Sequence, residues 1–442
     1  MTANGFRALT VLMLSLGLTV IVAACGGGGG NEGGGGTTTG TTTEQVSGKV
    51  SVMGIWVGEE QKSFQAVVDG FKDVQPDVTV KYNPVGDNLP TVLSTAVAGG
   101  NPPDVAAIAQ PGLLLQFADQ GKLKPLTFAK AAATANFGAD LVKSGSVDGT
   151  FYGLDWKANN KSTVWYNVKA FDDAGVTGAS DWDQFLQDAQ TIKASGLPAY
   201  SIGGADGWTL TDLFENIYLR TAGPDKYDQL AKHEIKWTDP SVKEALTDMG
   251  KIFSDSGNIA GGTTGALQTD FNTSVSNVFS PDPKAAMVIE ADFVPGVVKT
   301  TLKPQTGFNE FAFPSINGSS AVVAGGNLII IFRDTPAVRA FINYMVTPAS
   351  AEIWVKRGGF ASPNKKVPAS AYSDPLLKKT SLALTNAQTL RFDLSDLQPT
   401  SFGATVGQGE WKIFQDFLKN PSNVDGIAQQ LEQAASKAYK SS

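Results

Sequence analysis

The sequence predicts an α/β protein with two lobes, built on mostly parallel sheets that carry helices on their faces. The chain has 442 residues, too many for one ordinary domain, and its 42% apolar content is enough to bury two cores. Segments with the two-residue period of strands alternate along the chain with segments of helical period. Strands that alternate with helices are joined by crossovers, so this order favours parallel sheets covered on both faces.

The first 24 residues are predicted to be a signal peptide. An apolar run at 8–24 follows Arg7, is short for a helix that spans a membrane, and ends in small residues. Residues 22–25 (Val-Ala-Ala-Cys) resemble the bacterial lipobox, which implies cleavage before Cys25 and lipidation of that cysteine. An uncleaved membrane anchor is the alternative for the same segment.

Residues 25–45 are predicted to be the lipidated cysteine and a flexible tether. Gly and Thr make up most of this segment, and no apolar side chain in it could start a core. A random coil of about 20 residues reaches on the order of 25 Å, enough to hold a folded body just off a membrane. The body is expected from Val46 on, without a disulfide, because Cys25 is the one cysteine of the chain.

The body opens with alternating strand and helix patterns. Residues 50–56 alternate as a half-buried strand, and the apolar residues between 64 and 71 keep helical spacing. A strand is expected at 78–82, a helix at 89–98 and a buried strand at 104–109. Further strands are predicted at 162–166, 200–202, 285–289 and 321–332. Further helices are predicted at 181–194, 211–221, 336–346, 349–356, 411–418 and 424–439.

Charge and rare residues exclude several classes of function. The net charge is −7, so the surface repels phosphate backbones and nucleic acid is not an expected partner. The single histidine, His233, stands in a polar run and is expected to be a solvated surface residue. One Cys and one His supply too few ligands for a zinc site and argue against Ser-His-Asp or Cys-His catalysis. Mechanisms that use carboxylates alone remain open.

Four segments occur in an order that resembles a known family. They are Trp56-Val57-Gly58-Glu59-Glu60, residues 100–105 (Gly-Asn-Pro-Pro-Asp-Val), residues 152–157 leading to 164–167, and residues 358–364 (Gly-Gly-Phe-Ala-Ser-Pro-Asn). Together they resemble the extracellular solute-binding proteins of ABC importers, in the carbohydrate-binding group (family 1) related to maltodextrin-binding proteins. Residues 219–224, 391–393 and 395–397 look most like the branch that handles α-glucosides such as sucrose, maltose or trehalose.

The resemblance implies a two-lobed periplasmic-binding-protein fold of type II, with the ligand in the cleft between the lobes and no cofactor. Lobe 1 would hold residues 46–158 and 321–368, and lobe 2 residues 159–320 and 369–442, with hinges near 158–161, 319–321 and 367–370. The implied protein is a monomer outside the cytoplasm, at the cell surface or in the periplasm, bound to a membrane through its lipid only. It would capture a mono- or oligosaccharide and deliver it to the transmembrane subunits of an ABC permease.

The candidate contacts combine flat rings for the faces of a sugar with polar groups for its hydroxyls. Trp56, Trp156 and Trp208 stand at loops or strand ends, where open α/β sheets bind ligands. By contrast, Trp165, Trp182, Trp354 and Trp411 are expected to be structural. The resemblance places Gln110, Asn160, Trp208 and Phe293 at sugar-contact positions, with Phe360 of the fourth segment as a further candidate. The charged candidates for hydroxyl contacts are Glu59, Glu60, Lys157, Asp292, Arg391 and Asp396.

Three other functions were weighed against sugar binding. A secreted glycoside hydrolase would need only two carboxylates across a sugar cleft, and the chain has many. Ser362-Pro363-Asn364-Lys365 fits the S-x-x-K pattern of penicillin-binding enzymes, but the Lys-Ser-Gly triad at 143–145 precedes it, which is the wrong order. A purely structural surface lipoprotein would bind no small solute.

Overall fold

The computed structural model describes residues 45–298 and 302–440, and Gln45–Ser442 form one compact unit. The predicted signal peptide, the lipidated Cys25 and the tether lie outside the described residues. The strands are β1 (Gly48–Gly54), β2 (Val78–Pro84), β3 (Val105–Ile108), β4 (Ser146–Val147), β5 (Thr150–Phe151), β6 (Gly153–Asn160), β7 (Thr163–Asn167), β8 (Met287–Ile289), β9 (Phe308–Ala312), β10 (Val322–Ile331) and β11 (Leu390–Phe392).

Each predicted helix is present, but the helix predicted at 211–221 (α8) extends well beyond that range, and several shorter helices were not predicted. The helices are α1 (Gly58–Val74), α2 (Leu89–Ala98), α3 (Pro111–Asp119), α4 (Lys130–Phe137), α5 (Ala139–Ser144), α6 (Val168–Ala174), α7 (Trp182–Ala194), α8 (Trp208–Ala231), α9 (Pro240–Phe253), α10 (Gly262–Ala266), α11 (Phe271–Val278), α12 (Val294–Val297), α13 (Pro336–Met345), α14 (Pro348–Val355), α15 (Pro375–Asn386), α16 (Leu394–Leu397), α17 (Thr400–Gly403), α18 (Gly409–Lys419) and α19 (Val424–Ala438). Asp181 caps α7 by accepting a hydrogen bond from the backbone N–H of Gln184.

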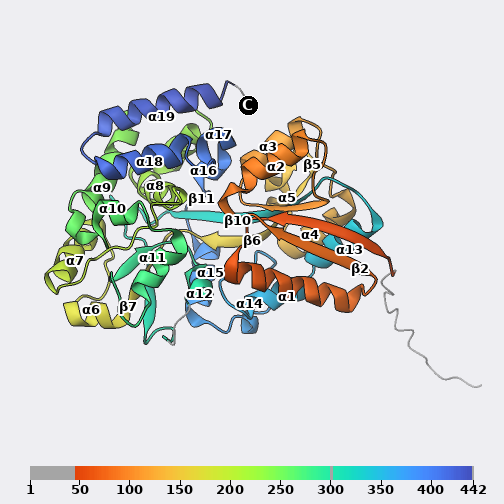
Figure 1. Ribbon diagram of the computed structural model, residues 1–442, viewed down its shortest axis with the longest axis horizontal. Coiled ribbons are helices and arrows are strands. Elements are labelled where there is room, and N and C mark those ends of the chain that lie inside the picture. The colour runs from red at the N-terminus through yellow and green to blue at the C-terminus, as the bar shows by residue number, and fades with distance from the viewer. Residues whose placement is uncertain (1–44, 299–301, 441–442) are drawn as a thin grey trace, which may run out of the picture. The chain divides into compact units, whose positions relative to one another are not determined.

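A six-stranded mixed sheet follows the order β11-β10-β3-β1-β2, and β6 also pairs with β10. Strand β1 runs parallel to β2 and β3, whereas β10 runs antiparallel to β3 and β6. Strands β10 and β6 lie side by side near the middle of Figure 1. Gly326 lets β10 and β6 approach, because a Cβ there would lie 2.7 Å from the carbonyl oxygen of Lys157. Strand β6 was not predicted from the sequence.

A second sheet, in the order β8-β7-β9, is antiparallel throughout. It differs from the predicted, mostly parallel arrangement. The strand expected at 200–202 is reduced to single parallel bridges from Tyr200 to Ile259 and to Met287. The parallel pairing in this half of the chain therefore amounts to isolated residue pairs beside an antiparallel ladder.

The apolar side chains form separate cores around the two sheets. One core includes Val50, Phe64, Trp156 and Trp354 on one face of the six-stranded sheet, and a smaller core around Phe117 covers the other face. Another large core joins α7, α8, α9, α18 and α19, and a fourth surrounds Trp165 of β7. Length and apolar content therefore predicted correctly that the chain buries more than one core.

Helix α8 is buried on all sides over its first half. Every residue from Thr209 to Arg220 is buried. Asp212, Asn216 and Arg220 follow one another at four-residue spacing and so share one face of the helix. Buried polar side chains need hydrogen-bond partners, so this face must be matched by polar groups from elsewhere in the chain.

Candidate ligand-binding site

A pocket of about 180 Å³ is lined by residues that come from the six-stranded sheet and its loops and by residues from the helices around the second sheet. The β1–α1 loop, the turn before α2, the end of β3 and strands β6 and β10 line one side. The start of α8, the start of α11, the segment around α12 and helices α16 and α18 line the other side. Parts of the chain that are far apart in sequence thus meet around one space.

Three aromatic rings form one wall of this pocket. The centroid of the Trp208 ring lies 5.3 Å from that of Phe271 and 6.1 Å from that of Phe293, and the Phe271 and Phe293 centroids are 5.2 Å apart. All three side chains are half-buried. Mutual packing holds the rings in place and leaves aromatic surface at the pocket, which suits the apolar face of a ring-shaped ligand.

Strand β6 contributes Lys157 and Asn159, because alternate residues of a strand point to the same side. The Lys157 ammonium bonds to the carboxylate of Glu60 and lies 5.4 Å from the centroid of the Phe293 ring. Trp156 is on the opposite face of β6, where it points into the core and donates its indole N–H to the carbonyl of Met345 at 2.9 Å. The pleat of one strand thus divides a binding face from a packing face.

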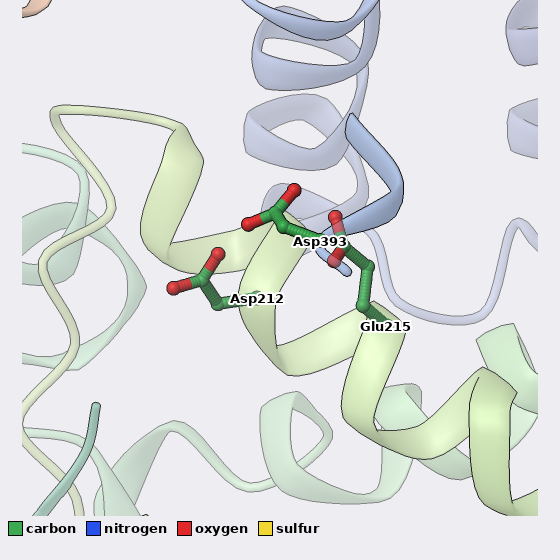
Figure 2. A group of neighbouring side chains, drawn as sticks. All are labelled: Asp212, Glu215 and Asp393. Atoms are coloured by element: carbon green, nitrogen blue, oxygen red, sulfur yellow. The ribbon is translucent and has the colours of Figure 1, made fainter. Parts of the chain in front are cut away.

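A buried ion cluster lies beneath the start of α8. Lys161 Nζ bonds to Asp212 Oδ1 at 2.9 Å and to the carboxylate of Asp393. Asp212, Glu215 and Asp393 converge (Figure 2), and one oxygen from each lies within 4.8 Å of the others. Such a group could hold a metal ion by spacing alone. However, the Lys161 ammonium already supplies the positive charge, and Glu215 accepts hydrogen bonds from two backbone N–H groups of α16.

The pKa shifts of the cluster follow from burial and from this one ammonium. Burial alone would lower the pKa of Lys161, but Asp212 and Asp393 outweigh it and hold that pKa well above its usual value. Burial raises the pKa of Asp212 to about 7 despite the attraction of Lys161. Burial also acts on Asp393, yet Lys161 keeps the pKa of Asp393 below its usual value. The cluster therefore concentrates its negative charge on Asp393.

A second group of carboxylates faces the aromatic wall. Burial, followed by the nearby charge of Asp206, raises the pKa of Asp87 to about 7. Burial also raises the pKa of Asp206, which accepts a hydrogen bond from the backbone N–H of Phe271 at 2.6 Å. At neutral pH these groups can present both hydrogen-bond donors and acceptors to a ligand.

Several polar atoms around the pocket are buried and have no hydrogen-bond partner within the described residues. They are Oε1 of Gln110, Oδ1 of Asn159, Oδ2 of Asp212 and Nε1 of Trp411. A buried polar atom without a partner costs free energy, about 1–3 kcal/mol in typical proteins. Three acceptors and one donor around a space with an aromatic wall match a ligand that carries several hydroxyl groups.

The structure brings eight of the predicted contact residues to the pocket. These are Trp56, Glu59, Glu60, Gln110, Lys157, Trp208, Phe293 and Asp396. The ring of Trp56 is only 1% exposed, and its indole N–H donates to Asn327 Oδ1 at 3.1 Å. Trp56 therefore borders the pocket mainly as a packed residue.

The other five predicted residues do not line the pocket. Trp156 and Phe360 pack against each other in the core, with ring centroids 4.8 Å apart. Asn160 is turned away by the alternation of β6 and donates from Nδ2 to the carbonyl of Thr380. Asp292 is buried and donates its backbone N–H to the carbonyl of Asn160. Arg391 pairs with Asp228 of α8, with Nε 2.7 Å from Oδ1.

Sequence reasoning also missed residues that line the pocket. They include Asp87, Asn159, Lys161, Asp206, Asp212, Phe271, Asn327, Asp393 and Trp411. Trp411, which was expected to be structural, is 4% exposed and has its indole N–H unpaired among the described residues. The period of β6 could have selected Asn159 with Lys157, and helical spacing could have selected Asp212 with Trp208.

Residues 56–352 match the family described as bacterial extracellular solute-binding protein. The chain belongs to this family. Its two-lobed α/β fold agrees with the predicted fold class, and the resemblance drawn from the sequence is confirmed.

Curated relatives of this solute-binding protein support the same conclusion. One is the alpha-glucosides-binding periplasmic protein AglE of Rhizobium meliloti (strain 1021), 33% identical over 86% of this chain and 85% of the relative. Another is the osmoprotective compounds-binding protein GgtB of Synechocystis sp., 30% identical over 84% of this chain and 88% of the relative. Both names describe binding proteins, and the glycoside-hydrolase alternative receives no support from them.

Solved structures share the fold of this solute-binding protein. A chitin oligosaccharide binding protein superposes with a TM-score of 0.77 at 22% identity, covering 89% of this chain and 99% of that one. RafE in complex with raffinose superposes with a TM-score of 0.73 at 19% identity, covering 89% of this chain and all of that one.

None of the helices at 45–298 and 302–440 combines the length and apolar content that a membrane crossing needs.

Proposed function

We propose that the chain is the sugar-binding component of an ABC importer and carries a mono- or oligosaccharide, an α-glucoside first of all. The observation that carries this proposal is the set of unpaired polar atoms on Gln110, Asn159, Asp212 and Trp411 beside the rings of Trp208, Phe271 and Phe293. A sugar offers hydroxyl groups to these polar atoms and the C–H faces of its ring to the aromatic side chains. The name of AglE, a binder of α-glucosides, supports the choice of sugar.

Capture would follow from the closing of two lobes around one ligand. In this proposal lobe 1 holds residues 46–158 and 321–368, and lobe 2 holds residues 159–320 and 369–442. The sugar would favour the closed form because only that form brings both sets of contacts to it. The permease would recognise the closed form and receive the sugar, and the protein itself would catalyse no reaction. Cys25 would carry the lipid that holds the protein, as a monomer, outside the cytoplasm.

The test is titration calorimetry of the full chain with maltose, sucrose, trehalose and raffinose. A panel of charged and neutral osmolytes is the second arm, because the name of GgtB refers to osmoprotective compounds. Tight binding of a glucoside, with no release of reducing ends from it over hours, supports the proposal. Binding of osmolytes but no sugar, or hydrolysis of the glucoside, would contradict it.

A pair of variants tests the site itself. Trp208→Ala removes a pocket ring and should weaken sugar binding more than tenfold, equivalent to about 1.4 kcal/mol, while the melting temperature changes little. Trp156→Phe alters a core ring on the opposite face of β6 and should lower the melting temperature while the sugar affinity of the folded protein stays near that of the wild type. The reverse pattern would show that the ligand lies elsewhere.

A further inference from the structure

A second cavity, of about 390 Å³, lies where the chain passes between the two sheets. Its walls come from the β6–β7 connection, the end of β9, the start of β10 and helices α8 and α15. It shares no lining residue with the pocket described above. Ala179, Phe311, Phe313 and Ala383 make much of the lining apolar, and serine residues stand between them.

Arg220 is the charged side chain of this cavity, and it is only 4% exposed. Its Nη1 donates to the carbonyl oxygen of Asn216 at 2.8 Å and to Asn216 Oδ1 at 3.0 Å. Its Nε is buried and has no partner within the described residues. The guanidinium carbon lies 4.7 Å from the centroid of the Phe313 ring, which fixes the plane of the group.

Arg220 has no carboxylate partner within the described part of the chain, which is unusual for a buried cation. Lys157 and Lys161, the other buried cations, each bond to a carboxylate. Burial lowers the pKa of Arg220 to about 9, and no acidic neighbour offsets this effect. A buried positive charge without a counter-ion is costly, and an anion that entered the cavity would remove part of that cost.

We propose that this cavity binds a small oxyanion, a carboxylate or a phosphate, through the guanidinium of Arg220. The planar fork of a guanidinium matches two oxygens of one such group, and Nε–H is the donor left free for it. The apolar lining beside Arg220 favours an anion that carries an apolar body over a bare ion. This site is separate from the sugar pocket, and its occupancy does not depend on the identity of the sugar.

Hydrogen bonds connect Arg220 to the segment between β6 and β7 and to the start of β10. Asn216, its hydrogen-bond partner, donates from Nδ2 to the carbonyl of Lys161 at 2.9 Å and accepts from the hydroxyl of Ser162. Ser162 Oγ also accepts from the backbone N–H of Val323 at 2.9 Å. The anion site is therefore one residue away from the two segments that join β6 to β7 and lead into β10.

The test measures anion binding to the full chain by titration calorimetry and thermal unfolding at pH 7 and constant ionic strength. Inorganic phosphate, acetate and benzoate are compared with chloride. At saturation one or more of the three should bind with one-to-one stoichiometry and raise the melting temperature by about 2 °C or more relative to chloride. Benzoate should bind more tightly than acetate if the apolar lining contributes.

Three variants decide the result. Arg220→Met should weaken anion binding more than tenfold. Ala383→Phe narrows the cavity from α15 without changing Arg220, so it should weaken binding too and covers the case in which Arg220→Met does not fold. Arg333→Met is the control, because it removes an arginine whose side chain is 49% exposed. The Arg333→Met protein should bind anions as tightly as the wild type does. Failure of all three anions to bind, or equal binding by all variants, would overturn the proposal and leave Arg220 a packing residue.

Discussion

Replacement of Lys161 by Met should be among the most destabilising single changes in this protein. The ammonium bonds to two buried carboxylates, those of Asp212 and Asp393, and its own side chain is 10% exposed. Removing one member of a buried ion pair leaves uncompensated charge and costs about 3–5 kcal/mol. We therefore expect Lys161→Met to lower the free energy of unfolding by about 3–5 kcal/mol at pH 7.5, measured by urea denaturation.

The loss should become smaller in acid. Without Lys161, only the hydrogen bonds from Ser395 Oγ and the backbone N–H of Asp396 still lower the pKa of Asp393, and burial should raise that pKa as it does for Asp212. Protonation at pH 5.5 would neutralise these carboxyl groups and remove much of the penalty. Lys193→Met is the matched control, because Lys193 pairs with Asp255 at the surface, with side chains 40% and 36% exposed, and should cost about 0–1 kcal/mol. An equal loss in both variants, or a loss for Lys161→Met that does not depend on pH, would refute the reasoning.

Two further predictions concern pH and the close contact between Gly359 and α12. Burial raises the pKa values of Asp87, Asp212 and Asp292 to about 7, so the folded state still holds protons that the unfolded state releases near pH 4. The free energy of unfolding of the wild type should therefore fall by at least about 2 kcal/mol between pH 5 and pH 8 in urea titrations. A constant free energy of unfolding over this range would contradict the prediction. Gly359→Ala should weaken sugar binding about tenfold in calorimetry, because the new Cβ would lie 2.9 Å from the Cα of Gly296 in α12 and would push on the helix that follows the pocket ring of Phe293. Gly358→Ala is the control, since Gly358 also has positive φ but its Cβ would meet no atom within 4 Å; equal effects of both changes would show that backbone strain, not the contact with Gly296, decides affinity.

The elements that the sequence predicted correctly are those whose apolar residues repeat with the period of the structure that buries them. The expected helix at 89–98 is α2, and the strand expected at 321–332 is β10 (Val322–Ile331). Strand β6 was missed because both of its faces are covered, one by the core and one by the pocket. Buried polar residues such as Lys157 and Asn159 remove the simple alternation of apolar and polar types that marks a strand.

The candidate site was predicted only in part, because lining a pocket depends on side-chain direction rather than residue type. Trp156 and Lys157 are neighbours in the sequence and were both chosen, yet the pleat of β6 sends one into the core and the other to the pocket. Trp411 is buried like a core residue, and only the fold shows that it borders the pocket and that its indole N–H has no partner among the described residues. Lys161 needed three distant segments to meet before its role as a counter-ion could be seen.

The central place of β10 has a consequence for how the protein is made. Strands β3 and β6 both pair with β10, which is translated roughly 170 residues after β6 ends. At ribosomal speeds of about 5–20 residues per second, the growing chain waits on the order of 10–30 s for the strand that joins β3 to β6. During that interval the early strands have unpaired edges, so a nascent chain of this protein should bind chaperones until residue 331 has left the ribosome.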